Sequence, residues 1–182
     1  MTAETTDADL VASLAAGRAE ALDALMARHE DLVFAVCLRI MGSRDLALDA
    51  AQETFLTLFR KADRYRNEAA FTTWLYRVAT NTCYDMLRKL KRRAADPLPD
   101  HVDPVDARAA DPFTSVELRP AVTDALRRIP DEFRAAVVLS DIEGLGIAEI
   151  AGVLGIPPGT VKSRVFRGRR LLADLLGNSL QT

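Results

Sequence analysis

The side chains best suited to contact nucleic acid lie near the C-terminus, in the segment PPGTVKSRVFRGRR. A helical rotation of about 100° per residue places Val161 and Val165 on one side and Ser163 and Arg167 on the other. Hydroxyl and guanidinium groups in such an array can hydrogen-bond to base edges and phosphates in the major groove of DNA. The alternative is an ordinary basic surface helix. The candidates are Thr160, Lys162, Ser163, Arg164, Arg167 and Arg170.

A second group of polar and aromatic side chains occupies residues 65–88. Arg77 and Asn81 are one helical turn apart, and the polar, partly aromatic stretch ADRYRNEAAF precedes their helix. Amides can read an unstacked base, rings can stack on it and cations can hold phosphates, so the pattern suits single-stranded DNA. Tyr65, Phe71 and Trp74 could equally belong to the core. The candidates are Tyr65, Asn67, Phe71, Trp74, Arg77, Asn81, Tyr84 and Arg88.

A polar, mostly acidic stripe with one apolar member is expected on a helix running from about residue 44 to residue 62. Ala51, Phe55 and Leu58 cluster on one side of this helix, and Leu56 lies on the other. An exposed leucine among carboxylates is a reasonable anchor for a basic protein surface, although a solvated face is the simpler interpretation. The candidates are Asp45, Asp49, Gln52, Glu53 and Leu56.

Catalytic chemistry finds no support in the sequence. Metal-ligand spacing, a Walker loop and a paired-carboxylate site are all absent, and His29 and His101 stand isolated. We therefore expect no catalytic residue, metal, cofactor or small-molecule substrate, against the alternative of an enzyme that acts on nucleic acid. Cys37 and Cys83 each lie in an apolar helical pattern, so we expect buried, reduced thiols rather than a redox sensor or a metal site.

The elements that must position these groups are helices, because no alternating strand pattern is long enough to count. The segment IAEIAGVLGIPPGTVKSRVFRGRRLL has the form of a helix-turn-helix, with Gly155 at the turn and Pro157 and Pro158 at the start of the second helix. Residues 94–114 contain four prolines and five aspartates, the composition of an extended, self-repelling linker. The predicted helices are 22–40, 44–62, 70–92, 115–129, 131–141, 147–154 and 158–176.

The fold class that follows is all-α, with two small helical domains joined by a flexible acidic linker and a helix-turn-helix in the second. We place the domains at residues 1–94 and 115–182, with the linker at 95–114.

Charge is distributed unevenly along the chain, although the formal net charge is only −2. Residues 60–93 carry ten basic and three acidic side chains, and residues 158–182 carry five and one. Two basic blocks separated by acidic stretches indicate two polyanion-contacting surfaces. The N-terminus lacks the pattern of a secretory signal and the longest apolar run is too short to span a bilayer, so a cytoplasmic protein is expected.

These segments resemble the sigma-70 family of bacterial RNA polymerase subunits, specifically its extracytoplasmic-function (ECF) group. AQETFLTLF resembles the segment that binds the polymerase clamp helices, WLYRVATNTCYDMLRK the segment that recognises the −10 promoter element, and the helix-turn-helix the segment that reads the −35 element. By this resemblance Arg77 and Asn81 would read −10 bases, and the loop at 65–71 would hold an extruded nucleotide. Arg164 and Arg167 would contact −35 DNA.

The same resemblance implies the partners: core RNA polymerase, contacted at its clamp helices and flap, promoter DNA, and an anti-sigma factor that is often membrane-anchored. One departure is that DLALDAAQETF lacks the Asp-Ala-Glu-Asp run common before the glutamine, which weakens the assignments of Asp45 and Asp49. A competing hypothesis is a promoter-bound regulator with an N-terminal receiver or ligand domain. The helical, basic N-terminal half with no βαβ pattern argues against it.

Overall fold

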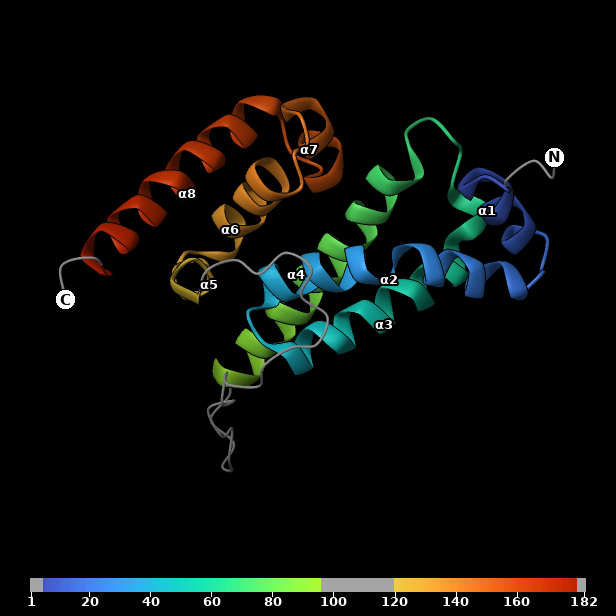
Figure 1. Cartoon of the computed structure of the whole chain (residues 1–182), viewed down its shortest axis with the longest axis horizontal. Coiled ribbons are helices and arrows are strands. Elements are labelled where there is room, and N and C mark those ends of the chain that lie inside the picture. The colour runs from blue at the N-terminus through green and yellow to red at the C-terminus, as the bar shows by residue number, and fades with distance from the viewer. Residues whose placement is uncertain (1–4, 96–119, 180–182) are drawn as a thin grey trace.

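The computed structural model describes residues 5–95 and 120–179, and every secondary-structure element in these two ranges is a helix (Figure 1). The predicted all-α class is therefore confirmed. Apart from Ala95, which ends a helix, the predicted linker at 95–114 lies outside the described residues, as do His101 and residues 115–119. The predicted domain boundaries stay predictions, and residues 5–95 and 120–179 are called the first and second half below.

The first half is built around one long central helix, α2, which contacts α1, α3 and α4. Gly42 ends α2 in the left-handed conformation, at φ 71°, where a side chain is disfavoured and glycine is not. Leu25, Ile40 and Leu75 are fully buried between these helices. The elements are α1 (Asp7–Ala15), α2 (Glu20–Met41), α3 (Arg44–Lys61), the 3-10 turn η1 (Ala62–Arg64) and α4 (Phe71–Ala95).

The helix α1 was not expected from the sequence, because nine residues are too few to show a clear helical period. Its N-terminus nevertheless has a recognisable helix-capping sequence, Thr6 followed three residues later by Asp9. The Thr6 hydroxyl accepts from the backbone N–H of Asp9 at 3.2 Å, and the Asp9 carboxylate accepts from the backbone N–H of Thr6 at 3.1 Å. This reciprocal capping satisfies two amides that a helix start leaves unpaired.

The second half contains the helix-turn-helix. In this half Gly155 ends α7 in the left-handed conformation at φ 65°, and Val161 and Val165 of α8 are buried, as the sequence predicts. The predicted helix 131–141 is wrong in part, because its last turn widens into a π-helix. The elements are α5 (Pro120–Arg128), α6 (Asp131–Val137), the π-helix η2 (Val138–Ile142), α7 (Ile147–Leu154) and α8 (Pro158–Ser179).

The two halves pack directly on each other. Helix α7 contacts α4, while α5, α6 and η2 contact α2. Leu139, Ile150 and Val153 of the second half belong to the same buried cluster as Leu75 and Tyr76 of the first. Figure 1 shows the second half (orange and red) lying along one side of α2 and α4. No helix within the described ranges has both the length and the apolar character needed to cross a membrane.

The crossing of α6 and α8 depends on a glycine. A Cβ atom built on Gly168 would lie 2.5 Å from Val137 Cγ2, closer than such atoms approach, and 3.1 Å from the carbonyl oxygen of Phe133, a tight contact. Gly177 of the same helix has nothing within 4 Å of that position. Gly168 and Gly177 of α8 therefore form a matched pair, one crowded and one open.

We expect Gly168→Ala to lower the free energy of unfolding by about 1–3 kcal/mol, because α8 must move away from α6. Urea titration followed by circular dichroism measures the change. Gly177→Ala should instead leave the stability unchanged or raise it by about 0.5–1 kcal/mol, because alanine favours the helix without a clash. Equal stability of Gly168→Ala and the wild type would contradict the close crossing.

Candidate nucleic-acid interface

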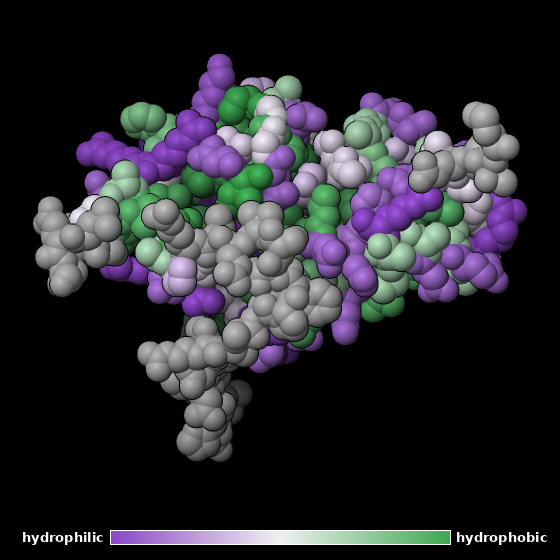
Figure 2. All heavy atoms as spheres, viewed as in Figure 1, coloured by the Kyte–Doolittle hydropathy of each residue, from purple (hydrophilic) through white to green (hydrophobic). Residues whose placement is uncertain are grey.

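The outer face of α8 presents the basic array expected from the sequence. Lys162, Ser163, Arg167 and Arg170 are exposed, whereas Thr160 and Arg164 are half-buried. Figure 2 shows hydrophilic side chains along the outer edge of this helix.

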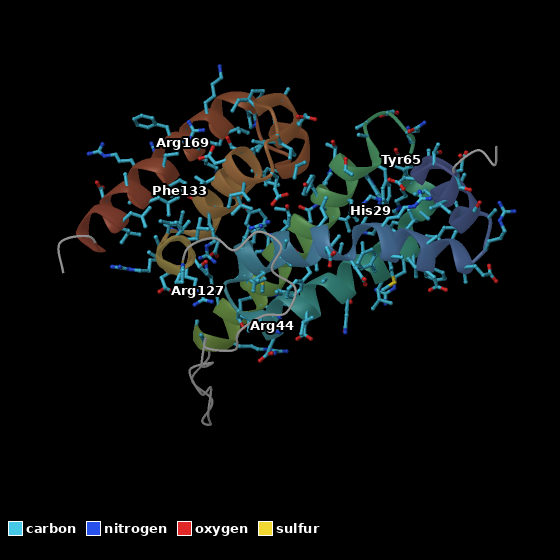
Figure 3. All side chains as sticks on the ribbon, viewed as in Figure 1. His29, Arg44, Tyr65, Arg127, Phe133 and Arg169 are labelled. Atoms are coloured by element: carbon cyan, nitrogen blue, oxygen red, sulfur yellow. The ribbon has the colours of Figure 1, made fainter. Side chains whose placement is uncertain are left out.

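Two further α8 side chains shape this face. Phe166 is 69% exposed, which gives the cationic surface an apolar member. Arg169 lies on the same helix but pairs with Asp141, its Nε lying 2.9 Å from the carboxylate, so it is held against the second half itself (Figure 3). The pair lowers the pKa of Asp141.

The exposed stripe of α4 is the second candidate surface. Arg77, Asn81 and Arg88 are exposed and Trp74 is half-buried, and their spacing places all four along one side of the helix. Arg88 forms an exposed ion pair with Asp85, one turn away. The side chains of Arg77 and Asn81 are thus available to contact a ligand. The side chain of Arg88 becomes available when its ion pair with Asp85 breaks.

Three residues on or beside that stripe, two of them predicted candidates, are less accessible than their helical spacing suggests. Thr80 is fully buried, and the hydroxyl of the half-buried Tyr84 is inaccessible. The second half covers this part of α4, where burial raises the pKa of Tyr84 to about 12 and the charge of Arg164 acts on it. Phe71 is 5% exposed, packed beneath the loop, so its predicted direct contact with DNA is not available in this arrangement.

An aromatic cluster supports the loop that precedes α4. The ring centroids of Tyr65 and Trp74 lie 5.5 Å apart, and those of Tyr65 and Phe71 lie 5.8 Å apart in an edge-on arrangement. The Tyr65 hydroxyl is 3.0 Å from both Asn67 Oδ1 and the carbonyl oxygen of Ala69. Asn67 adopts φ 53°, a left-handed conformation that asparagine tolerates, so the loop is held in a defined turn.

A hollow of about 320 Å³ lies between this loop and α1. The small side chains of α1 form one wall, and the loop supplies a phenol, an amide and a guanidinium on the other. The hollow thus combines small apolar groups with hydrogen-bonding groups and the carboxylates of Asp9 and Asp63. The lining residues are Ala8, Asp9, Val11, Ala12, Ala15, Ala62, Asp63, Tyr65, Arg66 and Asn67.

The outward face of α3 carries all five residues expected there, and all are exposed: Asp45, Asp49, Gln52, Glu53 and Leu56. Sequence reasoning missed two apolar members, Leu48 and Phe59, which are 40% and 49% exposed beside Leu56 at 46%. Their spacing from Leu56, eight residues back and three forward, is helical and could have revealed them. The face is therefore an apolar stripe bordered by carboxylates, and Arg60 pairs with Glu53 at 3.2 Å.

Glu143 joins the two halves through two hydrogen bonds. Arg39 Nη1 donates to its Oε1 and the Tyr76 hydroxyl donates to its Oε2, each at 2.8 Å. The side chains of Arg39 and Glu143 are only 15% and 11% exposed, so water screens this pair weakly. Burial, and then the hydrogen bond to Glu143, raise the pKa of Tyr76, so the phenol stays a donor.

Arg134, a buried side chain of α6, makes a second connection between the two halves. Its Nη1 donates to the carbonyl oxygen of Ile40 at 2.5 Å, and its Nη2 lies 3.1 Å from the carbonyl oxygen of Ile129 and from Asp131 Oδ1. Burial lowers the pKa of this guanidinium. Lys91 adds an exposed ion pair to Asp131 at 2.5 Å.

Among the described residues, no group of three or more histidine, cysteine or acidic side chains is placed to hold a metal ion. Both cysteines are buried and free, as expected for structural thiols. The hydrogen bond to Cys37, and then burial, raise the pKa of Cys83, which keeps the thiol protonated and unreactive.

Comparison with known families assigns both halves. Residues 25–93 match the model for sigma-70 region 2, and residues 119–172 match the model for sigma-70 region 4. The ECF RNA polymerase sigma factor SigM of Mycobacterium tuberculosis is 42% identical over 96% of this chain and 86% of its own length. The chain belongs to the sigma-70 family, in its ECF group. An ECF sigma factor is a transcription initiation subunit and not an enzyme.

Other comparisons agree with the assignment of this chain to the ECF sigma factors. The ECF RNA polymerase sigma-E factor of Escherichia coli strain K12 is 33% identical over 94% of this chain and 95% of its own length. Among solved structures, CnrH in complex with the cytosolic domain of CnrY aligns with a TM-score of 0.66 and 26% identity over 94% of this chain and 97% of that one.

The sigma factor RpoE in complex with the anti-sigma factor NepR, from Bartonella quintana, aligns with a TM-score of 0.71. At 24% identity over 85% of this chain and 96% of that one, it supports the fold alone.

We expect Glu143→Gln to loosen the contact between the halves of this sigma factor, because a neutral amide loses the charge-assisted bond to Arg39. The free energy of unfolding should fall by about 1.5–3 kcal/mol, the usual net value of a hydrogen bond to a charged group. Urea titration measures the stability, and small-angle X-ray scattering should show a larger radius of gyration.

Glu149→Gln is the matched control, since Glu149 is exposed and accepts only from the Gly146 N–H of its own half, at 2.8 Å. This variant should behave as the wild type. If Glu143→Gln has the wild-type stability and size as well, Glu143 does not hold the halves together.

Proposed function

We propose that this ECF sigma factor binds core RNA polymerase, recognises −35 duplex DNA with α8 and captures the melted −10 strand with α4 and the loop before it. The observation that carries the proposal is the separation of chemistry among three exposed faces. One is apolar and acidic, one combines amide, guanidinium and aromatic groups, and one is basic with hydroxyls. Each matches a different partner of transcription initiation.

The α3 face is the proposed contact for the clamp helices of polymerase. Leu48, Leu56 and Phe59 supply exposed apolar area that binding would remove from water, and this area accounts for most of the affinity in such contacts. The carboxylates of Asp45, Asp49 and Glu53 border it and favour a basic partner surface. Gln52, exposed on the same face, adds amide hydrogen bonds at the rim. We assign a second contact, to the polymerase flap, to the second half.

Capture of the −10 strand is proposed for the α4 stripe and the adjoining loop. Arg77 and Asn81 can hydrogen-bond to base edges and phosphates, and Trp74 offers part of a ring for stacking. The hollow beside Tyr65 and Asn67 has room for a nucleobase, and the turn that borders it is already fixed by hydrogen bonds. A preformed site lowers the cost of holding an unpaired nucleotide.

Binding of both elements at once requires the halves to separate. The elements centred at −35 and −10 lie about 25 base pairs apart, roughly 85 Å along B-DNA. In the arrangement described above, Arg164 of α8 lies close enough for its charge to affect the pKa of Tyr84 in α4. The two proposed DNA-reading helices, α4 and α8, are therefore neighbours. A chain of 24 residues, the number from 96 to 119, can span at most about 80–86 Å, and the dimensions of the two halves add to this reach.

An anti-sigma factor is the proposed regulatory partner. One structural relative is the sigma factor RpoE in complex with the anti-sigma factor NepR, and another, CnrH, is in complex with the cytosolic domain of CnrY. A protein that covers the α3 face would block polymerase binding. We place the complex in the cytoplasm, where core polymerase works.

We expect Arg167→Ala to weaken binding to −35 duplex DNA about tenfold, or to relax base preference there by a similar factor, because an arginine contact to a base is worth about 1–3 kcal/mol. Arg169→Ala is the matched control, since Arg169 is engaged with Asp141. Holoenzyme titrated with promoter fragments that it selects from genomic DNA measures both. Equal loss in the two variants would mean that α8 contributes only general charge.

We expect Asn81→Ala to reduce opening of a duplex promoter about tenfold, because it removes an amide that binds the separated strand. Permanganate reactivity of thymines at the −10 element measures the opening. A template already mismatched at −10 should show a smaller defect, and core binding should be unchanged. Normal reactivity in the Asn81→Ala holoenzyme on duplex DNA would refute strand capture by this face.

A further inference from the structure

A buried histidine links α1 to the aromatic cluster beneath the nucleotide-binding loop. His29 of α2 is 8% exposed, and its Nε2 lies 2.9 Å from Asp7 Oδ2. Because an ionised carboxylate can only accept, Nε2 carries the proton in this bond. The His29 ring also makes an apolar contact: its centroid lies 5.2 Å from that of the Phe71 ring, and the two ring planes are tilted by 60°.

The contacts continue from His29 to the loop without a gap. Phe71 is the first residue of α4 and meets both Tyr65, at 5.8 Å, and Trp74, at 6.1 Å. Tyr65 in turn fixes the turn through Asn67 and Ala69. Burial, and then the negative charge of Asp7, raise the pKa of Tyr65, so its hydroxyl remains a donor. Figure 3 shows His29 and Tyr65 toward the same end of the molecule, beside α1.

We infer that His29, held by Asp7, is a positioning residue for capture of the −10 strand: it fixes the aromatic cluster and sets α1 as the far wall of the hollow. This inference rests on the proposed capture function. Asp7 lies outside the segment that matches the region 2 model, which begins at residue 25. The assignment therefore adds to this surface a helix that the family match does not cover.

The geometry explains why histidine suits this position. The side chain must bury a flat face against Phe71 and still present one N–H to a carboxylate about 3 Å away. Leucine could fill part of the space but would leave Asp7 without this donor. Glutamine would lose the ring contact but could keep the donor, so the two substitutions separate the hydrogen bond from the packing.

The test compares His29→Leu, His29→Gln and Arg28→Leu in reconstituted holoenzyme. Arg28 is the matched control, because it pairs with the other oxygen of the same carboxylate, Asp7 Oδ1, at 2.9 Å and lies on the surface. We expect His29→Leu to reduce opening of the duplex promoter about tenfold, with a smaller defect on the premelted template and normal core binding. His29→Gln should recover most of the opening, and Arg28→Leu should resemble the wild type.

Trp74 provides an independent fluorescence measurement, because it is the only tryptophan in the chain. Its fluorescence should shift to longer wavelength in His29→Leu and stay unchanged in Arg28→Leu. If His29→Leu does not fold, Asp7→Leu removes the same hydrogen bond from its half-buried carboxylate end, and comparison with Arg28→Leu accounts for the ion pair that is lost with it.

Two outcomes would overturn the inference, and neither is the failure of strand capture itself. One is wild-type opening by His29→Leu while Asn81→Ala is defective, which would leave capture intact and remove the positioning role. The other is an equal defect in His29→Leu and Arg28→Leu, which would assign the effect to α1 attachment in general. Normal opening by Asn81→Ala would instead refute the capture function on which the inference rests.

Discussion

A buried guanidinium fixes how the two halves of this sigma factor meet. Arg134 is 6% exposed and donates to the end of α2, to the end of α5 and to Asp131. A charge removed from water in this way is stabilised by hydrogen bonds, and the acceptors for the two terminal nitrogens of Arg134 come from both halves, whereas its buried Nε has no hydrogen-bond partner within the described residues. The position of α6 against α2 therefore sets the position of α7 against α4. The face that each reading helix presents follows from that contact.

The same contact combines apolar and polar interactions between the halves. Its apolar part is continuous with the core, but its polar part consists of Arg134, Glu143 and Lys91, each of which water can solvate once the halves part. Ion pairs of this kind select one orientation more than they add stability. An interface of this mixed kind is compatible with the proposed binding of promoter DNA, in which the two halves would separate.

Much of this architecture is legible in the sequence, because it depends on local rules. The helix-turn-helix follows from Gly155, the prolines and the valine spacing of α8, and the exposed α3 face follows from helical period alone. The burial of Thr80 and Tyr84 does not, because the period of α4 shows which residues share a side and not which side a distant helix covers. The burial of Phe71 is hard to predict for a related reason: an aromatic residue beside a loop can face inward or outward, and here its ring packs against His29 of another helix.

The connections between the halves also dictate an order of folding. Arg134 and Ile40 are 94 residues apart in the sequence, and Arg39 and Glu143 are 104 apart. Contacts of such separation form last, since the entropy of closing a long loop must be overcome before they contribute. On the ribosome, the first half emerges and folds while Glu143 has not yet been synthesised. The nascent chain therefore passes through a stage in which the α4 surface later covered by α7 is open to solvent, and to any chaperone that reaches it.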